Sequence, residues 1–490
     1  MQQPDACCNL DYAGALPVAV LRVWFESAMG EETSATSTTS GRGVASRERW
    51  QSVDLVALGV ISLLAAALRL LFIEQWSYGP QEAVTWRALT APLSGHEASF
   101  ASSREAAFPL VYLLLRELLE RGVLPGMTEG WLRLPFAFAG CLVTPLVALW
   151  ARPLLGRAAG VLAALAVAVH PACITSSQTA DPAVFAAAAT LFAGVFSTRG
   201  WRLLAAGAVV IAGLCHPLGW FAAGGVALIG RAPKWWDHAG AGWLLSLVPL
   251  AAPAILGLGY GPAWTAALLA CLALRGGIPQ ARFLAGALLL PLAAAGLWCW
   301  SDSSVVAAAR AITAPFVVAC AAWACVQFAR AAAGRLEVSA PVGRMVGAAP
   351  LLMLIGELLA ASFLYFTVYE GDRSAWRDAR SAVAAMRKPG EDLVVVAGRG
   401  VDVLRTYLRP NHWRLPGEDL HAGVEVRALA SDAEARRAQL QEENALFVLL
   451  PDERDSMGPA AVELVVLALW PSPKAVGDGS LCVMRRRAPP

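Results

Sequence analysis

The chain has 490 residues, of which 57% are hydrophobic and only 16% are charged, and its formal net charge is +2. A soluble globular protein carries about 25% charged residues, so this composition excludes an ordinary soluble enzyme. The chain is also far too apolar to be disordered, and its small net charge gives no indication of nucleic-acid binding. The ten cysteines form no CxxC pair and no Cys/His cluster with zinc spacing, so we interpret them as small buried hydrophobic residues.

The first 50 residues differ from the rest of the chain. Residues 31–40 are rich in Ser and Thr and have no apolar period, which predicts a disordered cytoplasmic tail over residues 1–50. The apolar run 14–25 is interrupted by Arg22 and has no clear cleavage site, so it does not predict a signal peptide.

Long apolar runs begin at residue 53 and predict a polytopic α-helical membrane domain over residues 51–368. The first run, 53–73, is long enough to cross a bilayer core. Runs of this length in lipid must be helical, because lipid cannot hydrogen-bond an open backbone. We predict about eleven spans; the other ten are expected at 131–151, 158–174, 182–198, 202–216, 217–231, 240–259, 261–275, 282–300, 305–330 and 345–368.

Positive charges mark every second connection between these runs. Arg152 and Arg157, for example, lie between the second and third runs, whereas the next connection, 170–181, has no Lys or Arg. By the positive-inside rule this alternation places the N-terminus in the cytoplasm, and an odd number of spans places the C-terminus outside. The sequence therefore predicts a multi-pass protein of the cytoplasmic (inner) membrane.

Two regions do not fit a purely apolar bundle. The first outer loop, 74–130, contains the stretch 108–121, which mixes Leu with charged residues and predicts an amphipathic helix lying along the outer surface. The tail, 369–490, predicts a small extracytoplasmic α/β domain of ordinary size. Its helix-like stretches are 375–386, 431–444 and 459–469, and its β-like runs are 392–397, 445–450 and 480–484.

Carboxylates at the predicted outer ends of the spans are functional candidates, because an ionisable group left unpaired in lipid is costly. Asp181 precedes a proline, so a helix N-cap is the alternative to a chemical role. For Glu82 the alternatives are a solvated loop carboxylate or a partner for a helix dipole. We expect His170 and His216, which each precede a proline, to be caps facing water rather than ligands. The carboxylates in question are Glu74, Glu82, Asp181 and Asp302.

Four segments occur in an order that resembles the membrane C-type glycosyltransferases, in particular the protein O-mannosyltransferase and aminoarabinose transferase branch. They are 80–83 (PQEA; family pattern PDEA), 105–112 (EAAFPLVY; family pattern HPPLYY or EKPP), 131–135 (WLRLP; family pattern RLPS) and 177–182 (SQTADP; a polar run ending in DP). The resemblance covers about residues 53–200. It implies transfer of a sugar from a polyprenyl-phosphate donor to an acceptor lipid, glycan or protein at the outer face.

The resemblance also implies roles for individual residues. Glu82 or Asp181 would deprotonate the acceptor hydroxyl. An arginine fork would pair with the lipid phosphate. The predicted substrate-binding set is Arg87, Arg104, Arg133, Gln178 and Tyr112.

One position departs from the family pattern. The first acid of the family pair is expected to be the catalytic base, and here it is Gln81. A glutamine cannot accept a proton at neutral pH or bring charge to a metal. The pattern also loses its His or Lys before Pro109, where Ala107 and Phe108 stand. No metal ligand is predicted, and whether a divalent cation takes part stays open.

These departures leave two other hypotheses. A catalytically degenerate relative would keep the fold and bind a lipid-linked sugar or a partner enzyme. A secondary transporter is disfavoured, because transporters carry polar or broken helices near the bilayer midplane. The predicted spans here hold almost no charge, Glu357 being the clearest exception.

Overall fold

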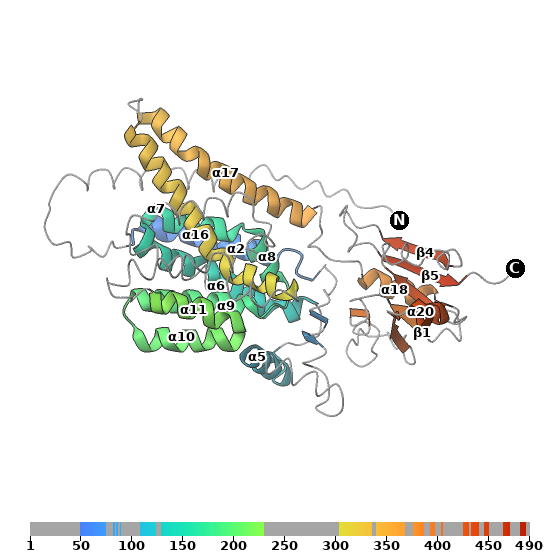
Figure 1. The fold of residues 1–490 in the computed structure, drawn as a ribbon. Coiled ribbons are helices and arrows are strands. Elements are labelled where there is room, and N and C mark those ends of the chain that lie inside the picture. The colour runs from blue at the N-terminus through green and yellow to red at the C-terminus, as the bar shows by residue number, and fades with distance from the viewer. Residues whose placement is uncertain are drawn as a thin grey trace.

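The computed structural model describes most of the helical region and the elements of the tail (Figure 1). The described residues are 50–74, 82–83, 85–86, 89, 108–123, 129–229, 303–335, 340–367, 376–386, 393–396, 403–404, 425–430, 433–440, 445–449, 464–470 and 481–486. In Figure 1 a helical body lies beside a smaller part that contains a β-sheet. The helices of the body are α2 (Ser52–Leu70), α5 (Pro109–Glu120), α6 (Glu129–Leu155), α7 (Arg157–Ala168), α8 (Pro171–Gln178), α9 (Ala183–Thr198), α10 (Arg202–Cys215), α11 (Pro217–Ile229), α16 (Ser303–Arg335) and α17 (Ala340–Thr367).

Several of these helices are suited to a membrane. Within the described ranges, three are long and apolar enough to cross it, namely α2, α6 and the part of α16 from Ala308 to Gln327. The pair α7 and α8 makes a fourth if a helix bent by 52° counts as one span. The chain is thus a polytopic helical membrane protein, while its full span count and orientation stay predictions. The runs predicted at 240–259, 261–275 and 282–300 lie outside the described residues.

The run predicted as a single span at 158–174 is two helices. α7 ends at Ala168 and α8 begins at Pro171, which has no backbone N–H and disfavours a helical residue before it. Nδ1 of His170 accepts a hydrogen bond from the N–H of Ala172 at 3.2 Å and so caps the new helix. His170 is therefore the predicted cap, but it is only 1% exposed, so the expectation that it faces water is wrong.

Small side chains form the centre of the helical body. Every residue of α7 is buried, and most of them are Ala, Val or Gly. In lipid, small residues let helix backbones approach closely, and the resulting van der Waals packing replaces the hydrophobic effect as the driving force. α7 packs against α6 and α16, and α9 and α10 pack against each other beside them.

The tail forms a five-stranded mixed sheet. Its strands are β1 (Leu393–Val396), β2 (Glu425–Ala428), β3 (Ala445–Leu449), β4 (Leu464–Trp470) and β5 (Leu481–Arg486), in the order β2-β1-β3-β5-β4. The first three strands of that order are parallel, and β5 pairs antiparallel with both β3 and β4. The helices of the tail are α18 (Trp376–Met386) and α20 (Ala433–Leu440).

The predicted strands at 392–397, 445–450 and 480–484 and the helices at 375–386 and 431–444 are confirmed by these elements. The helix predicted at 459–469 is wrong, because Leu464–Trp470 is strand β4. Its sequence, LVVLALW, is a short continuous apolar run, and periodicity alone cannot distinguish a buried strand of this kind from a helix.

One buried apolar cluster joins the sheet to the helical body. It contains Trp376, Val394 and Val483 from the tail together with Leu132 of α6 and Ala180, which lies between α8 and α9. The sheet therefore packs at the end of the bundle where α2 and α8 end and α6 and α9 begin. We call this the Glu82 end, and the opposite end of α2 the Asp54 end.

Candidate functional site

A buried ion pair stands at the centre of the Glu82 end. Nε of Arg133 donates to Oε1 of Glu82 at 2.7 Å, and Nη2 donates to Oε2 at 2.9 Å. The side chains are 0% and 2% exposed. Such a two-pronged contact fixes both planes relative to each other as well as neutralising both charges. Glu82 is thus not a solvated loop carboxylate, which was one of the alternatives to a chemical role.

The same pair also binds two segments of backbone. Oε1 of Glu82 accepts from the N–H of Ala180 at 3.2 Å, and Nη1 of Arg133 donates to the carbonyl of Ile73 at 2.8 Å. Two charged side chains therefore hold together the end of α2, the start of α6 and the connection between α8 and α9. A buried charge pair is tolerated when hydrogen bonds use its remaining donors and acceptors in this way.

Asp181 follows immediately in the chain. Its Oδ1 accepts from the N–H of Ala183 at 2.9 Å, which is the helix-capping contact that its position before Pro182 allows. The residue is partly exposed, in contrast to Glu82. The structure thus brings the two candidate carboxylates to the same place and gives them different surroundings.

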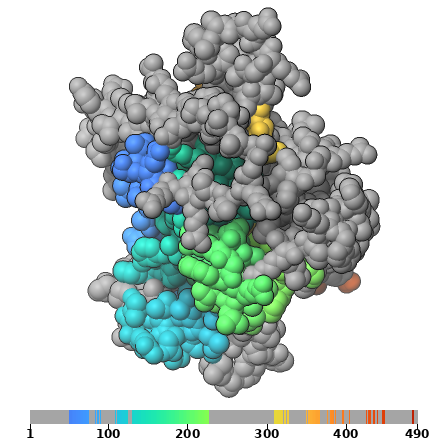
Figure 2. Space-filling view, turned by 90° about the vertical axis from the view of Figure 1, so that its left-hand side faces the viewer, coloured from blue at the N-terminus to red at the C-terminus, as the bar shows by residue number. Residues whose placement is uncertain are grey.

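The predicted amphipathic helix is α5, and it packs on this end of the bundle. Figure 2 shows α5 in cyan at the surface, below and beside α10 and α11 in green. Tyr112 is 1% exposed, so this predicted substrate-binding residue lies inside the apolar cluster. The ring of Phe108 stacks on the rings of Tyr112 and His216, with distances of 6.5 and 5.3 Å between the ring centroids. His216 caps α11 through the N–H of Leu218, but it is buried rather than facing water.

Gln178, another predicted substrate-binding residue, bridges three helices. Its Nε2 donates to the carbonyls of Leu68 and Leu71 at the end of α2, at 3.0 and 2.8 Å. The hydroxyl of Tyr365 on α17 donates to its Oε1 at 3.1 Å. Helix ends leave carbonyls without intrahelical partners, and Gln178 provides donors to those of α2.

Arg69 provides hydrogen-bond donors to the carbonyls at the end of α7. Its guanidinium is fully buried and donates to the carbonyls of Ala168 and Val167 at 3.2 and 3.3 Å and to its own helix at Ala65. No carboxylate within the described part of the chain pairs with it, so the negative ends of two helices supply the compensating charge. The sequence reasoning missed Arg69; its position in the last turn of an apolar span was the available signal.

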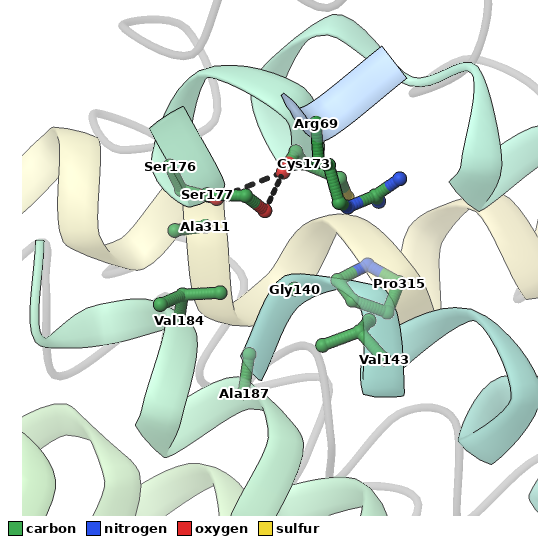
Figure 3. Close-up of a pocket in the computed structure, with 10 residues that line it drawn as sticks. All are labelled: Arg69, Gly140, Val143, Cys173, Ser176, Ser177, Val184, Ala187, Ala311 and Pro315. Carbon is green, nitrogen blue, oxygen red and sulfur yellow. Dashed lines mark hydrogen bonds between the residues drawn. The ribbon is translucent and has the colours of Figure 1, made fainter. Parts of the chain in front are cut away.

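A small cavity of about 10 Å³ adjoins this arginine, with room for about one water molecule. Figure 3 shows Ser176 and Ser177 turned towards Cys173 beside Arg69, and both hydroxyls donate to the Cys173 carbonyl. The cavity is too small for a sugar or a phosphate. We therefore interpret it as part of the joint between α2 and α8.

A second buried ion cluster, also missed from sequence, lies at the Asp54 end. Asp54 accepts from Nε of Arg157 at 2.7 Å and pairs with Nη1 of Arg152 at 3.2 Å. The ring of Trp50 lies 4.1 Å from the Arg152 guanidinium carbon. The two arginines that marked a predicted inner connection are thus buried structural partners of one carboxylate.

The remaining predicted site residues, Gln81, Arg87, Arg104 and Asp302, lie outside the described residues. Within the described ranges, no three His, Cys, Asp or Glu side chains gather as a metal site requires.

Two solved structures of ArnT from Cupriavidus metallidurans are similar to this chain. The apo structure has 14% sequence identity and a TM-score of 0.45, and the match covers 88% of this chain and 97% of that chain. The structure bound to undecaprenyl phosphate has 16% identity and a TM-score of 0.38, with the same coverage of 88% and 97%. No protein-family model and no curated protein matches the chain. Identities and TM-scores this low assign no function, so the proposal below stands on this chain's own residues.

Proposed function

We propose that this protein transfers a sugar from a polyprenyl-phosphate-linked donor to an acceptor lipid, glycan or protein at the outer face of the cytoplasmic membrane. The observation that carries the proposal is the contact of Glu82 with both Arg133 and Ala180, which are 51 and 98 residues away. These three residues come from three of the four segments that resemble the glycosyltransferases. The fourth segment supplies Tyr112, which belongs to the buried apolar cluster that joins the sheet to the helical body.

In this proposal Asp181 is the general base and Glu82 is a positioning residue. Both oxygens of Glu82 are committed to Arg133, whereas Asp181 is partly exposed next to that pair. Asp181 takes the proton of the acceptor hydroxyl, and the oxygen attacks the anomeric carbon of the donor sugar. The bond from that carbon to the phosphate oxygen breaks, and polyprenyl phosphate leaves. A positioned base of this kind contributes roughly 10²- to 10⁴-fold in rate.

The role of Arg133 changes accordingly. Its Nε and both Nη atoms already donate to Glu82 and Ile73, so we propose that it positions the loop instead of holding the lipid phosphate. Arg87 and Arg104 remain the proposed phosphate ligands, because an arginine fork matches phosphate geometry.

Asp181→Asn tests the proposal in membranes supplied with a radiolabelled polyprenyl-phosphate sugar. Asparagine is also a good helix cap, so the contact with Ala183 survives while the base is lost. We expect label incorporation to fall at least about a hundredfold with an unchanged amount of protein. Glu425→Gln, an exposed carboxylate on β2, is the matched control and should leave incorporation unchanged. Wild-type turnover in Asp181→Asn would contradict the assignment.

The commitment of Glu82 to Arg133 also favours a second candidate, a catalytically degenerate protein that binds a lipid-linked sugar. In that case neither Gln81 nor Glu82 can act as the expected base. The discriminating variant is Gln81→Asp. A gain of transfer would indicate a degenerate protein, whereas a loss from an active wild type would show that Gln81 takes part in the reaction.

A further inference from the structure

A larger cavity, of about 390 Å³, lies at the Glu82 end. Its wall includes Phe72, Ile73 and Glu74 after α2 and Trp131 and Leu134 of α6. Ligand pockets in proteins usually measure about 300–1,000 Å³ and are mostly apolar with a few polar groups. This cavity has that size, and apart from Gly130 and Glu74 its described lining residues carry apolar side chains.

The cavity adjoins the buried pair without exposing its positive charge. Ile73 lines the cavity, and its carbonyl accepts from Nη1 of Arg133 at 2.8 Å. Among the described residues that line the cavity there is no arginine or lysine, and Glu74 is the charged one. A carboxylate disfavours a phosphate at close range, so the phosphate of the donor is an unsuitable occupant.

Glu74 lies against the first turn of α6. The space that a Cβ atom would fill at Gly130 is occupied by the end of the Glu74 side chain, and Glu74 is an exposed residue. Trp131 lines the same cavity, and an aromatic residue together with a carboxylate is a favourable combination for binding a cation.

The backbone of the cavity wall adopts an unusual conformation at Phe72. Phe72 has a φ of +59°, a conformation that a bulky side chain rarely adopts. Its ring lies 6.2 Å from that of Phe366 on α17. Strained residues of this kind persist where the surrounding structure holds them, and they concentrate at binding sites.

We propose that this cavity binds the acceptor, and that the acceptor is an amphiphile whose apolar body lies in the cavity and whose amino group faces Glu74. Calling this ligand the acceptor rests on the proposed function. In that reaction the donor carries a phosphate, which does not suit the cavity, so the acceptor is the substrate that remains. The binding chemistry does not rest on the proposed function, since it follows from the volume of the cavity, its apolar side chains and the carboxylate of Glu74.

Octylamine, octanol and octyl phosphate, which share one tail, test this proposal on the full-length protein in lipid nanodiscs. Each is titrated against the thermal unfolding midpoint, which rises when a ligand binds the folded state. We expect octylamine to bind at least about tenfold more tightly than octanol, because this is the difference in affinity expected for one charged contact. Octyl phosphate should give no saturable shift.

Two variants and a control separate the cavity from general lipid effects. Glu74→Gln should remove the preference of about tenfold for octylamine over octanol. Leu134→Trp, which fills the cavity, should remove saturable binding of both. The control Glu425→Gln should behave like the wild type. Equal or tighter binding of octyl phosphate, or an unchanged preference in Glu74→Gln, would overturn the proposal. If Glu74→Gln fails to fold, the wild-type comparison and Leu134→Trp still decide.

The same titration distinguishes this proposal from the proposed function. Asp181→Asn should lose sugar transfer and keep octylamine binding. Octylamine binding to a protein that never transfers sugar would refute the transferase and leave the amine site standing. Transfer by a protein that does not bind octylamine would refute the amine site alone.

Discussion

The two ends of α2 are both held by buried ion pairs, but they differ in the number of described arginines that contact the carboxylate. At the Glu82 end one carboxylate faces one arginine, and hydrogen bonds to Ala180 and Ile73 use further atoms of the pair. At the Asp54 end one carboxylate is shared by two arginines, and an indole covers one of them. Among the described residues, one arginine contacts the carboxylate of Glu82, and two arginines contact that of Asp54.

The difference reflects what each pair connects. Arg152 and Arg157 stand on either side of the tight turn between α6 and α7, where Gly156 adopts a φ of +94° that favours glycine. Asp54 therefore closes a joint between consecutive helices. Glu82 instead joins loops that are far apart in sequence, and its contact with Ala180 holds the residue that precedes Asp181.

The largest effect is expected for Asp54→Asn. This change removes the carboxylate that both Arg152 and Arg157 contact, and breaking a buried pair costs about 3–5 kcal/mol. We expect a loss at the upper end of that range, measured by reversible unfolding in mixed detergent micelles. Glu425→Gln, whose carboxylate is 63% exposed, is the matched control and should stay close to the wild type. A stable Asp54→Asn protein would show that the Asp54 cluster contributes little.

Arginine substitutions at the two ends compare them directly. Arg133→Met removes the arginine that pairs with the buried Glu82 carboxylate. The change should therefore lower the free energy of unfolding by about 3–5 kcal/mol. Arg152→Met leaves Asp54 paired with Arg157 and loses mainly the contact with Trp50, so it should cost about 1 kcal/mol. Denaturant unfolding of both variants measures the difference. Equal losses would mean that a second arginine on the carboxylate does not distinguish the two ends.

The sequence contained part of this site. The order of four segments predicted that Glu82, Arg133 and Asp181 belong to one region, and the contact of Glu82 with Arg133 and Ala180 agrees with that prediction. It did not predict that Arg133 would bind Glu82, because an arginine near a motif fits a phosphate and a carboxylate equally well. Only the folded structure, in which the Glu82 carboxylate lies against Arg133 of α6, decides between them.

The other differences have similar physical causes. The apolar run 158–174 contains a bend between α7 and α8. Hydropathy does not predict this bend, because it measures apolarity and not the helix hydrogen bond that Pro171 cannot form. Asp54 and Arg69 escaped notice because each is a single charge at the end of an apolar span, and its partner lies about 100 residues away or is a backbone carbonyl. Hydropathy patterns locate apolar helices, but they predict neither the burial of single polar residues such as His170 nor long-range pairing.

The smallest effect concerns the joint that keeps the Glu82 end in place. Tyr365→Phe removes the hydrogen bond from α17 to Oε1 of Gln178 and leaves the ring packing with Phe366 unchanged. One buried hydrogen bond contributes about 1 kcal/mol, so the unfolding free energy should fall by about that amount. If Gln178 holds the end of α2 as proposed, sugar transfer should fall by a larger factor than stability alone explains, because Ile73 and the Glu82–Arg133 pair depend on where α2 ends. Unfolding and label incorporation measured on the same preparation separate the two effects. A loss of stability with fully retained transfer would assign Gln178 to packing alone and would place the positioning of Asp181 entirely in the ion pair.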